Sequence, residues 1–319
     1  MTPFSVIGGF LGAGKTTLIN RLLQRPRTPR LAILVNDFGD IAIDAALLEA
    51  HGGDTIALNN GCVCCSIGND LGRALGRVLD STTPFEQIVV EASGVANPGR
   101  IMDVARISSE LEPAGILVVV DAGAILRQLE DRWIADTVAA QLACADRFFI
   151  NRLETIDGAG RAGLQTRLAR DYRDIPQVSD ADAAWSLLAA DNPRKIAPRG
   201  ETAAHAPFCS RSLVSERALD PERLRAWLDG RGDVYRIKGW ARLAGGETRQ
   251  LQYAGDRIAW TPAAVGEPKQ TRLVVIGRGD LPAADAILAA ITVGEAAESA
   301  TGGCRGAPIR ETRRMPDGD

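Results

Sequence analysis

Residues 9–16 read GFLGAGKT and follow an apolar run at residues 4–7 that is predicted to be a β-strand. The spacing matches the pattern G-x-x-x-x-G-K-[ST], and a stretch with helical periodicity follows at residues 16–23. In this strand–loop–helix context, glycines allow successive backbone N–H groups to converge on a phosphate, and the N-terminus of the helix adds its dipole. The pattern therefore predicts a phosphate-binding loop at the carboxyl end of the first strand.

The side chains of this loop are predicted to bind a nucleotide and its magnesium ion. Lys15 is expected to reach the β- and γ-phosphates, and the Thr16 hydroxyl is expected to ligate Mg²⁺. The chain holds 33 arginines and only four lysines, so a lysine here points to the need for a compact charge. The alternative is a chance glycine turn before a helix. The expected nucleotide ligands in the loop are Gly9, Gly12, Ala13, Gly14, Lys15, Thr16 and Thr17.

Alternating strands and helices continue over the first half of the chain. The run at residues 116–120 is apolar throughout, which is typical of a parallel sheet covered on both faces. Strands are also predicted at residues 31–35, 55–58, 87–91 and 147–150, and helices at 16–23, 69–79 and 164–172. We therefore expect an α/β fold, a P-loop NTPase domain with a doubly wound, mostly parallel sheet, over residues 1–190.

A second, smaller α+β domain is predicted at residues 208–292. It follows a predicted linker at 191–207, where three prolines and scattered charges interrupt the pattern. Its expected strands are at residues 208–213, between 233 and 260 and at 272–276, and its expected helices at 221–228 and 283–291. Residues 293–319 are rich in Gly, Ala, Glu and Arg and are predicted to be a disordered tail.

Composition narrows the class of protein. The 319 residues are 45% hydrophobic and 24% charged, which is typical of a soluble globular protein, and the formal net charge is −3. A charge so close to neutral gives no bulk reason to bind nucleic acid or a membrane. No apolar run reaches the roughly 18 residues of a membrane span, and no basic leader or cleavage site is visible. We expect a cytoplasmic protein with neither nucleic-acid nor membrane partners.

Three of the six cysteines, Cys62, Cys64 and Cys65, lie within four residues after the predicted strand 55–58. Thiolates so spaced can converge on one soft ion, such as Zn²⁺, Cu⁺, Co²⁺ or Ni²⁺, and three ligands leave one tetrahedral position open. The alternatives are a packed cysteine cluster and a redox pair. A strain-free disulfide between the adjacent Cys64 and Cys65 is disfavoured. A transition-metal site is the preferred interpretation.

Two acidic segments are predicted to complete the catalytic site. Glu91 ends the predicted strand 87–91 and is expected to act on the Mg²⁺ shell or the attacking water, while the Gly94 N–H faces the γ-phosphate. Asp37 and Asp40 follow the strand 31–35 and are expected to position Mg²⁺, the transition metal or water, the alternative being a polar turn. The predicted catalytic residues are Lys15, Thr16, Asp37 and Glu91.

Residues 151–154 read NRLE after the predicted strand 147–150 and are similar to the Asn-Lys-x-Asp motif with which GTPases recognise guanine. Asn151, Arg152 and Glu154 are therefore candidate base ligands. Arg can stack on a base, and Glu can accept both guanine N–H bonds if the loop shifts to fit its extra methylene. Guanine selectivity is expected, with a looser fit than Asp would give.

In chain order, these motifs resemble the CobW family of metal-handling P-loop GTPases. The resembling stretches are residues 9–17, 36–40, 61–65, 91–94 and 151–154, and, in the C-terminal domain, 220–228, 238–240 and 273–279. The resemblance covers residues 3–292. It implies GTP hydrolysis coupled to delivery of a metal, most often zinc and in some members cobalt or another. Intrinsic hydrolysis is expected to be slow, because no arginine finger is identifiable in cis. It also implies that Cys62, Cys64 and Cys65 ligate that metal.

Besides Glu154 in the base motif, two further departures from the family distinguish this chain. Residues 35–40 read VNDFGD where many members have ENEFGE, and the chain has only two histidines, so a histidine-rich metal-collecting stretch is absent. The expected partners are GTP or GDP and an unidentified metalloprotein client, with a homodimer left open. The alternatives are a metal-sensing or buffering GTP-binding protein without a client, and a regulatory or assembly GTPase with structural cysteines.

Overall fold

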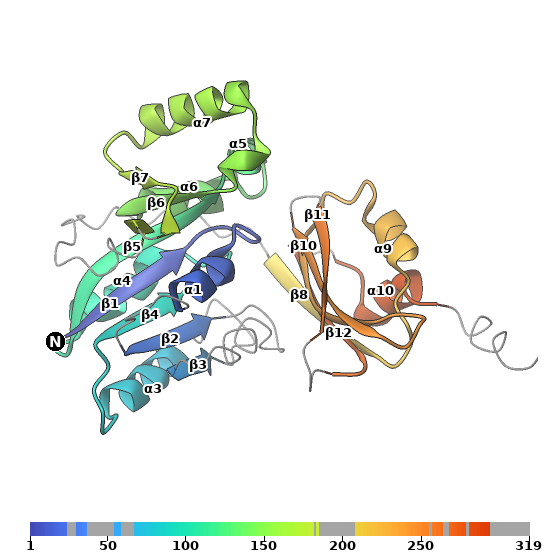
Figure 1. Ribbon diagram of the computed structural model, residues 1–319, viewed down its shortest axis with the longest axis horizontal. Helices are drawn as coiled ribbons and strands as arrows, with labels where there is room; N and C mark the ends of the chain where they lie inside the picture. The colour runs from blue at the N-terminus through green and yellow to red at the C-terminus, as the bar shows by residue number, and fades with distance from the viewer. Residues whose placement is uncertain are drawn as a thin grey trace, which may run out of the picture.

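Two β-sheets organise the protein (Figure 1). The computed structural model describes residues 1–23, 30–36, 54–58, 67–181, 183–184, 208–254, 257–263, 268–278 and 281–293. The predicted linker at 191–207 lies outside these residues, as does all but the first residue of the predicted tail at 293–319.

The first sheet has seven strands in the order β3-β2-β4-β1-β5-β6-β7, and every adjacent pair is parallel. Its strands are β1 (Thr2–Gly8), β2 (Leu31–Asn36), β3 (Asp54–Leu58), β4 (Gln87–Glu91), β5 (Leu111–Asp121), β6 (Arg147–Asn151) and β7 (Gln177–Val178). The helices between them are α1 (Lys15–Leu23), α3 (Ile67–Leu79), α4 (Pro98–Ile107), α5 (Ile125–Glu130), α6 (Ala135–Ala143) and α7 (Gly158–Asp171). A 3₁₀ turn, η1 (Leu153–Thr155), follows β6.

On the central strands, alternate residues pack on opposite faces of this sheet. On β1, Phe4 and Val6 contribute to one core cluster with α3, α4, α6 and α7, whereas Ile7 contributes to a second cluster with α1. Both faces are therefore covered, which explains why the strands are apolar throughout rather than alternating. The prediction of a doubly wound, parallel α/β fold is confirmed.

The second sheet has five antiparallel strands in the order β11-β10-β9-β12-β8. Its elements are β8 (Phe208–Ser215), α9 (Pro221–Leu228), β9 (Val234–Arg242), β10 (Thr248–Ala254), β11 (Arg257–Pro262), β12 (Thr271–Arg278) and α10 (Ala284–Ile291). The helices α9 and α10 close one face of this sheet through a core of its own. Trp240, Val274 and Ile276 instead join the larger core cluster of the first sheet. The α+β character predicted for the C-terminal part is confirmed.

Two helices begin with the same local signal. In α4 the Asn97 side chain accepts a hydrogen bond from the Gly99 backbone N–H at 2.9 Å, and Pro98 is the first helical residue. In α9 Asp220 caps the helix in the same way and Pro221 follows. A short polar cap and a proline at the first position satisfy or remove the exposed N–H groups of a helix start. These starts are therefore encoded locally.

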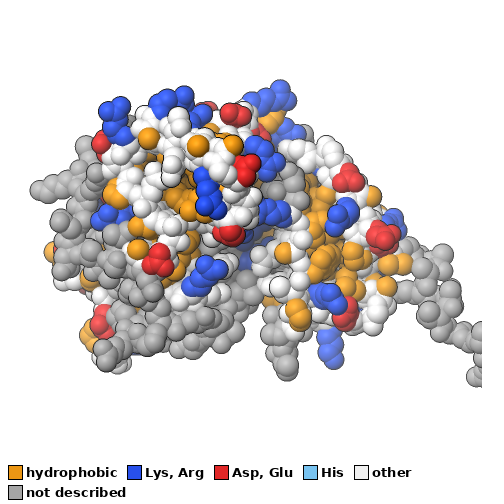
Figure 2. Space-filling view, turned by 45° about the horizontal axis from the view of Figure 1, so that its top comes forward, with side chains coloured by type: hydrophobic (Ala, Val, Ile, Leu, Met, Phe, Trp, Pro, Cys, Tyr) orange, Lys and Arg blue, Asp and Glu red, His pale blue; other side chains and the backbone are white. Residues whose placement is uncertain are grey.

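The surface carries charges of both signs. Figure 2 shows basic and acidic side chains interspersed over the face turned toward the viewer. Among the described residues, no helix combines the length and the apolar character that crossing a membrane would require.

A matched pair on α4 tests the packing of the first core. Ile101 is 1% exposed within that core, whereas Ile107 is 87% exposed at the end of the same helix. Ile101→Ala should lower the free energy of unfolding by about 2–5 kcal/mol because it removes buried methyl groups and leaves a cavity. Ile107→Ala should change it by less than about 0.5 kcal/mol. Urea denaturation followed by circular dichroism measures both, and equal effects would contradict this account of the core.

Candidate nucleotide site

The phosphate loop leaves the carboxyl end of β1, the central strand of the first sheet. Gly9, Gly12 and Gly14 all have positive φ angles, of 134°, 78° and 103°. At Gly14 an added Cβ would lie 2.4 Å from Asn151 Nδ2, so neither the backbone angle nor the space allows a side chain. The loop backbone is therefore held in the shape that a phosphate cradle needs.

Lys15 folds back over this loop. It is the first residue of α1 and is only 4% exposed. Its Nζ donates hydrogen bonds to the backbone carbonyls of Gly9 at 2.9 Å and Phe10 at 3.5 Å. The ammonium group is thus already placed beside the backbone that a phosphate would contact, on a helix N-terminus that favours negative charge.

Thr16 and Glu91 meet at the start of α1. The Thr16 hydroxyl donates to Glu91 Oε1 at 2.9 Å, and Glu91 is 3% exposed. The contact arises because β4 pairs with β1 in a register that sets Glu91 opposite Ile7. A hydroxyl and a carboxylate are the hard oxygen donors that Mg²⁺ prefers, so the pair fits the predicted magnesium site.

Gly94 lies directly against the phosphate loop. An added Cβ at this residue would lie 2.8 Å from the backbone N of Leu11 and 2.9 Å from its Cα. Two hydrogen bonds fix the position of the same segment, because Gln141 Nε2 on α6 donates to the carbonyls of Gly94 at 3.0 Å and Ala96 at 2.9 Å. The structure thus brings Gly94 to the loop, where its N–H was predicted to face the γ-phosphate.

Asn151 and Arg152 reach the phosphate loop from β6. Asn151 Nδ2 donates to the Ala13 carbonyl at 2.8 Å, and Arg152 Nη1 donates to the Gly12 carbonyl at 2.9 Å. Arg152 has a φ of 60° and is the only non-glycine residue with positive φ among those described. Such strain at a non-glycine residue is commonly found at functional sites. Both side chains therefore support the loop from the side on which a base is expected.

Asp121 holds Arg152 in place. Its Oδ2 lies 2.5 Å from Arg152 Nη1, and its Oδ1 accepts a hydrogen bond from the Gly123 backbone N–H at 3.0 Å. Asp121 ends β5, the other neighbour of β1, and pairs in register with Asn151. The carboxyl ends of β1, β4, β5 and β6 therefore all contribute to one site, which is where parallel α/β sheets bind ligands.

The remaining predicted site residues are exposed or fall outside the part of the chain that the structure describes. Thr17 is exposed on α1, and Glu154 is exposed on η1, two residues after Arg152. Asp37, Asp40, Cys62, Cys64 and Cys65 lie outside the described residues. Within the described part of the chain, no group of three or more His, Cys, Asp or Glu side chains is arranged to hold a metal ion.

Two residues of the site escape sequence reasoning. Asp121 has the same signal that singles out Glu91, an acid at the end of an apolar strand, but none of the motifs identified in the sequence includes it and it is not among the predicted site residues. Gln141 gives no signal, because one buried glutamine on an amphipathic helix resembles many others. Its role becomes visible only through its two hydrogen bonds to the segment after β4.

Comparison with known proteins identifies the family. Residues 3–179 match the sequence profile of the CobW/HypB/UreG nucleotide-binding domain, which is more than half of the chain. The chain belongs to this family. Residues 208–291 also match the cobalamin synthesis protein cobW C-terminal domain. The resemblance inferred from the motifs is thus confirmed, and the protein is a P-loop GTPase.

Several characterised proteins are similar to this member of the family. A zinc chaperone CobW from Sinorhizobium sp is 32% identical over 91% of this chain and 96% of its own. The zinc-regulated GTPase metalloprotein activator 1 of Schizosaccharomyces pombe is 33% identical over 48% of this chain and 39% of its own. The crystal structure of the Zn(II)-bound YjiA GTPase from E. coli covers 91% of this chain and 97% of its own, with a TM-score of 0.45 and 19% identity.

The thiol of Cys144 provides a test of the packing around this site. Burial raises the pKa of Cys144 to about 11, and its Sγ lies 3.2 Å from the Gln141 carbonyl. Since the thiolate is the reactive form, Cys144 should react with iodoacetamide at pH 7.5 far more slowly in the folded protein than in urea. Peptide mass spectrometry measures the labelling of each cysteine. Rapid labelling of Cys144 in the native protein would contradict the packing of α6 against the segment that follows β4, at residues 94–96.

Proposed function

We propose that this protein is a GTP-dependent metallochaperone that binds zinc at Cys62, Cys64 and Cys65 and passes it to a client metalloprotein. The convergence of four strand ends on one phosphate loop carries the nucleotide half of this proposal. Relatives named zinc chaperone and zinc-regulated GTPase metalloprotein activator support the metal half. Zinc in this role is cargo rather than a resident cofactor.

The nucleotide is bound through three sets of contacts. The backbone of the loop with Lys15 and Thr17 holds the phosphates, and Gly94 reads the γ-phosphate. Asn151 and Arg152 support the loop beside the base, and Glu154, exposed next to them, is free to turn toward guanine. Recognition of guanine rather than adenine then depends on the two N–H groups that Glu154 accepts.

Thr16 and Glu91 would hold the magnesium ion that accompanies GTP, with Asp37 and Asp40 as further candidates. The 2.9 Å contact between the Thr16 hydroxyl and Glu91 supports this assignment, because it brings two hard oxygen donors together beside Lys15. The ion neutralises phosphate charge. Glu91, buried at the carboxyl end of β4, orients the attacking water.

Chain geometry supports a metal site close to the nucleotide. β3, the strand that precedes the cysteine motif, lies three strands from β1 and ends at Leu58 on the same sheet edge. At the usual strand spacing this is about 14 Å from β1. The four residues from Leu58 to Cys62 can span at most about 14 Å. The chain length from Leu58 to Cys62 is therefore compatible with a metal site near the phosphate loop, and in the sequence Asp37 and Asp40 follow β2, one strand closer.

Metal affinity then depends on the nucleotide state. The proposed coupling runs from the γ-phosphate and its Mg²⁺ through residues 37–40 to the cysteine motif, in the way that switch segments of GTPases respond to nucleotide state. Hydrolysis of GTP then lowers the affinity of the cysteine motif for the metal and allows the client to take it. Coupling of this kind is typically about 1–3 kcal/mol, or roughly 5- to 150-fold in affinity, and must be reciprocal between the two ligands.

The phosphate contact is tested with Lys15→Ala. This substitution should weaken GTP binding by about 100-fold or more, because it removes charge-assisted contacts to two phosphates. Binding of a fluorescent GTP analogue measures the loss, and thermal melting checks that the fold persists. Arg21→Ala is the matched control, since it removes an exposed cation from the last turn of the same helix. Wild-type GTP affinity in Lys15→Ala would overturn the proposed nucleotide site.

The coupling is tested by zinc titration of the metal-free protein against a chromophoric chelator. We expect tighter zinc binding with a non-hydrolysable GTP analogue than with GDP, by about 5- to 150-fold. Cys65→Ser should remove most of the zinc affinity and the coupling while leaving nucleotide binding intact. Cys304→Ser, far from the motif in the sequence, is the control. Identical zinc affinity in the two nucleotide states would remove the mechanism of delivery and leave only a GTPase with a metal site.

A further inference from the structure

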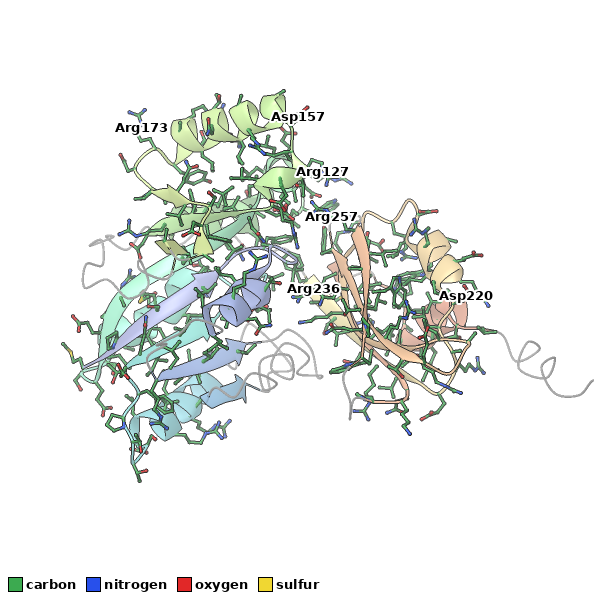
Figure 3. All side chains as sticks on the ribbon, viewed as in Figure 1. Arg127, Asp157, Arg173, Asp220, Arg236 and Arg257 are labelled. Carbon is green, nitrogen blue, oxygen red and sulfur yellow. The ribbon has the colours of Figure 1, made fainter. Side chains whose placement is uncertain are left out.

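We infer that the end of the C-terminal domain formed by β10 and β11 belongs to the nucleotide site. There Arg257 positions Arg152, because both guanidinium groups interact with the carboxylate of Asp121. This inference rests on the proposed nucleotide site and assigns the C-terminal domain a role in it. Figure 3 shows Arg257 on the side of the second sheet that faces the first. Three separate contacts between the two parts of the protein support the inference.

The first contact lies on the phosphate loop itself. Ala254, the last residue of β10, sits against Gly12, where an added Cβ would lie 2.3 Å from the Ala254 Cβ. Gly12 also has a φ of 78°, so this position requires glycine on two grounds. The carbonyl of the same residue accepts the hydrogen bond from Arg152. The C-terminal domain therefore packs on the one loop residue that Arg152 also holds.

The second contact is an aromatic cluster. Phe10, inside the phosphate loop, has its ring centroid 6.3 Å from those of both Phe208 and Tyr235. Phe208 and Tyr235 lie 5.7 Å apart, nearly edge to face. Aromatic pairs in edge-to-face or tilted arrangements stabilise a contact beyond the burial of their area. The loop is thereby anchored on its outer side by β8 and β9 of the second domain.

The third contact is electrostatic and joins the domain to Arg152. Arg257 pairs with Ala254 across the β10–β11 ladder, and its Nη2 lies 3.6 Å from Asp121 Oδ1. Asp121 Oδ2 holds Arg152, so a single carboxylate receives both guanidinium groups. The guanidinium of Arg257 also closes over Gly123, where an added Cβ would lie 2.9 Å from Nη2. Asp121 thus links the C-terminal domain to the residue that supports the base side of the loop.

Burial determines how strongly each of the two ion pairs of Asp121, with Arg152 and with Arg257, should affect nucleotide binding. The Asp121 side chain is 9% exposed, whereas that of Arg257 is 44% exposed. The pair of Asp121 with Arg152 is short and largely enclosed, while the pair with Arg257 is longer and screened by water. Asp121 should therefore matter more than Arg257, and Arg257 should act only through it.

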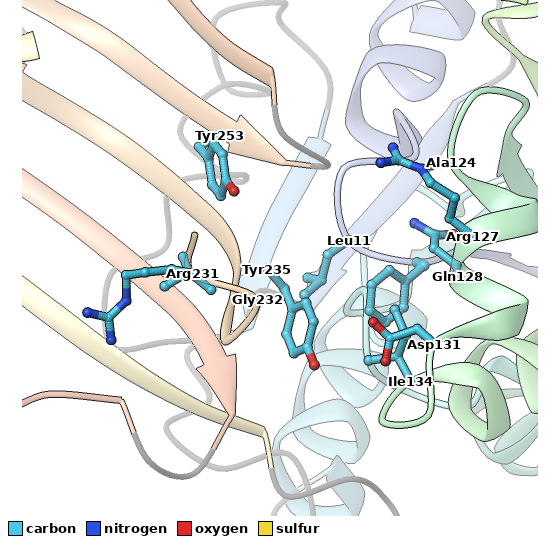
Figure 4. Close-up of a pocket in the computed structure, with 12 residues that line it drawn as sticks. Leu11, Ala124, Arg127, Gln128, Asp131, Ile134, Arg231, Gly232, Tyr235 and Tyr253 are labelled. Carbon is cyan, nitrogen blue, oxygen red and sulfur yellow. The ribbon is translucent and has the colours of Figure 1, made fainter. Parts of the chain in front are cut away.

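A cavity beside these contacts explains why they are important for domain docking. Residues of both domains line it, with Leu11, Ala124 and Asp131 on one side and Tyr235 and Tyr253 on the other (Figure 4). Packing across the interface is therefore incomplete, and a gap forfeits the dispersion contacts of its lining. Besides Trp240, Val274 and Ile276, which join the first core cluster, direct contacts across the interface lie at Phe10, Gly12 and Asp121, all in or next to the nucleotide site.

Nucleotide binding and domain docking are coupled as a consequence. A docked C-terminal domain holds Gly12 and Arg152 in the arrangement that receives the nucleotide, and a bound nucleotide must favour the docked arrangement by the same factor. The role of Arg257 is positioning: it touches neither phosphate nor base, and acts on Arg152 through Asp121.

The test is a double-mutant cycle on GDP affinity in the full chain, measured with a fluorescent GDP analogue. Arg257→Gln should weaken binding by about 2- to 5-fold, the range of an exposed ion pair. Asp121→Asn, which keeps the shape and the contact from Gly123, should weaken it by about 10-fold. In the Asp121→Asn background, Arg257→Gln should have no further effect. Arg249→Gln, exposed at the far end of the same hairpin, should leave the affinity unchanged.

Hydrogen exchange supplies the reciprocal measurement. Adding GDP should slow exchange in peptides covering β10 and β11 of the wild type, and less so in Arg257→Gln, while peptides covering α9 should not change. Independent, multiplicative effects of the two substitutions, or no effect of Arg257→Gln, would overturn the inference. That result would leave the proposed nucleotide site intact, because the site itself is contradicted only if Lys15→Ala binds GTP with wild-type affinity.

Discussion

The pairing of β1 with β4 on one side and β5 on the other is the constraint on which the site depends. A glycine-rich loop can cradle a phosphate in many proteins, but its partners are determined by the strands that flank it. Because all strands of the first sheet are parallel, their carboxyl ends meet at one edge. Glu91 and Asp121 end the two neighbouring strands, so one acid faces Thr16 and the other faces Arg152.

The site has two halves with different roles, one around Glu91 and the other around Asp121. Glu91 is buried against the start of α1, where a hydroxyl and an ammonium group gather around the expected position of Mg²⁺ and the outer phosphates. Asp121 lies on the opposite side of β1 and restrains a guanidinium group that holds the loop carbonyl of Gly12. Through Arg257 the C-terminal domain contacts this second half. The two halves can therefore be perturbed separately.

Sequence reasoning was strongest where signals are local. The phosphate loop, most strands of the first sheet and the helix at residues 221–228 were predicted close to their observed bounds, because apolar runs, glycines and capping residues act over a few positions. The strand β5 begins at Leu111, five residues before the predicted run, and β7 was not predicted. Sequence reasoning was weaker for contacts. Arg152 was predicted to stack on a base, and the structure adds that it bonds to Gly12 and Asp121. Gln141 and Arg257 resemble ordinary helix and strand residues until their partners are known.

The sequence by itself determined the nucleotide chemistry, the α/β class and the three-cysteine motif, since each depends on residue types at short, regular spacing. Only the tertiary structure decided that Asp121 also flanks the phosphate loop, how the segment at Gly94 is anchored and where the second domain docks. The physical reason is that these contacts join residues far apart in the chain. Their partners follow from strand order and domain packing, which local periodicity does not encode.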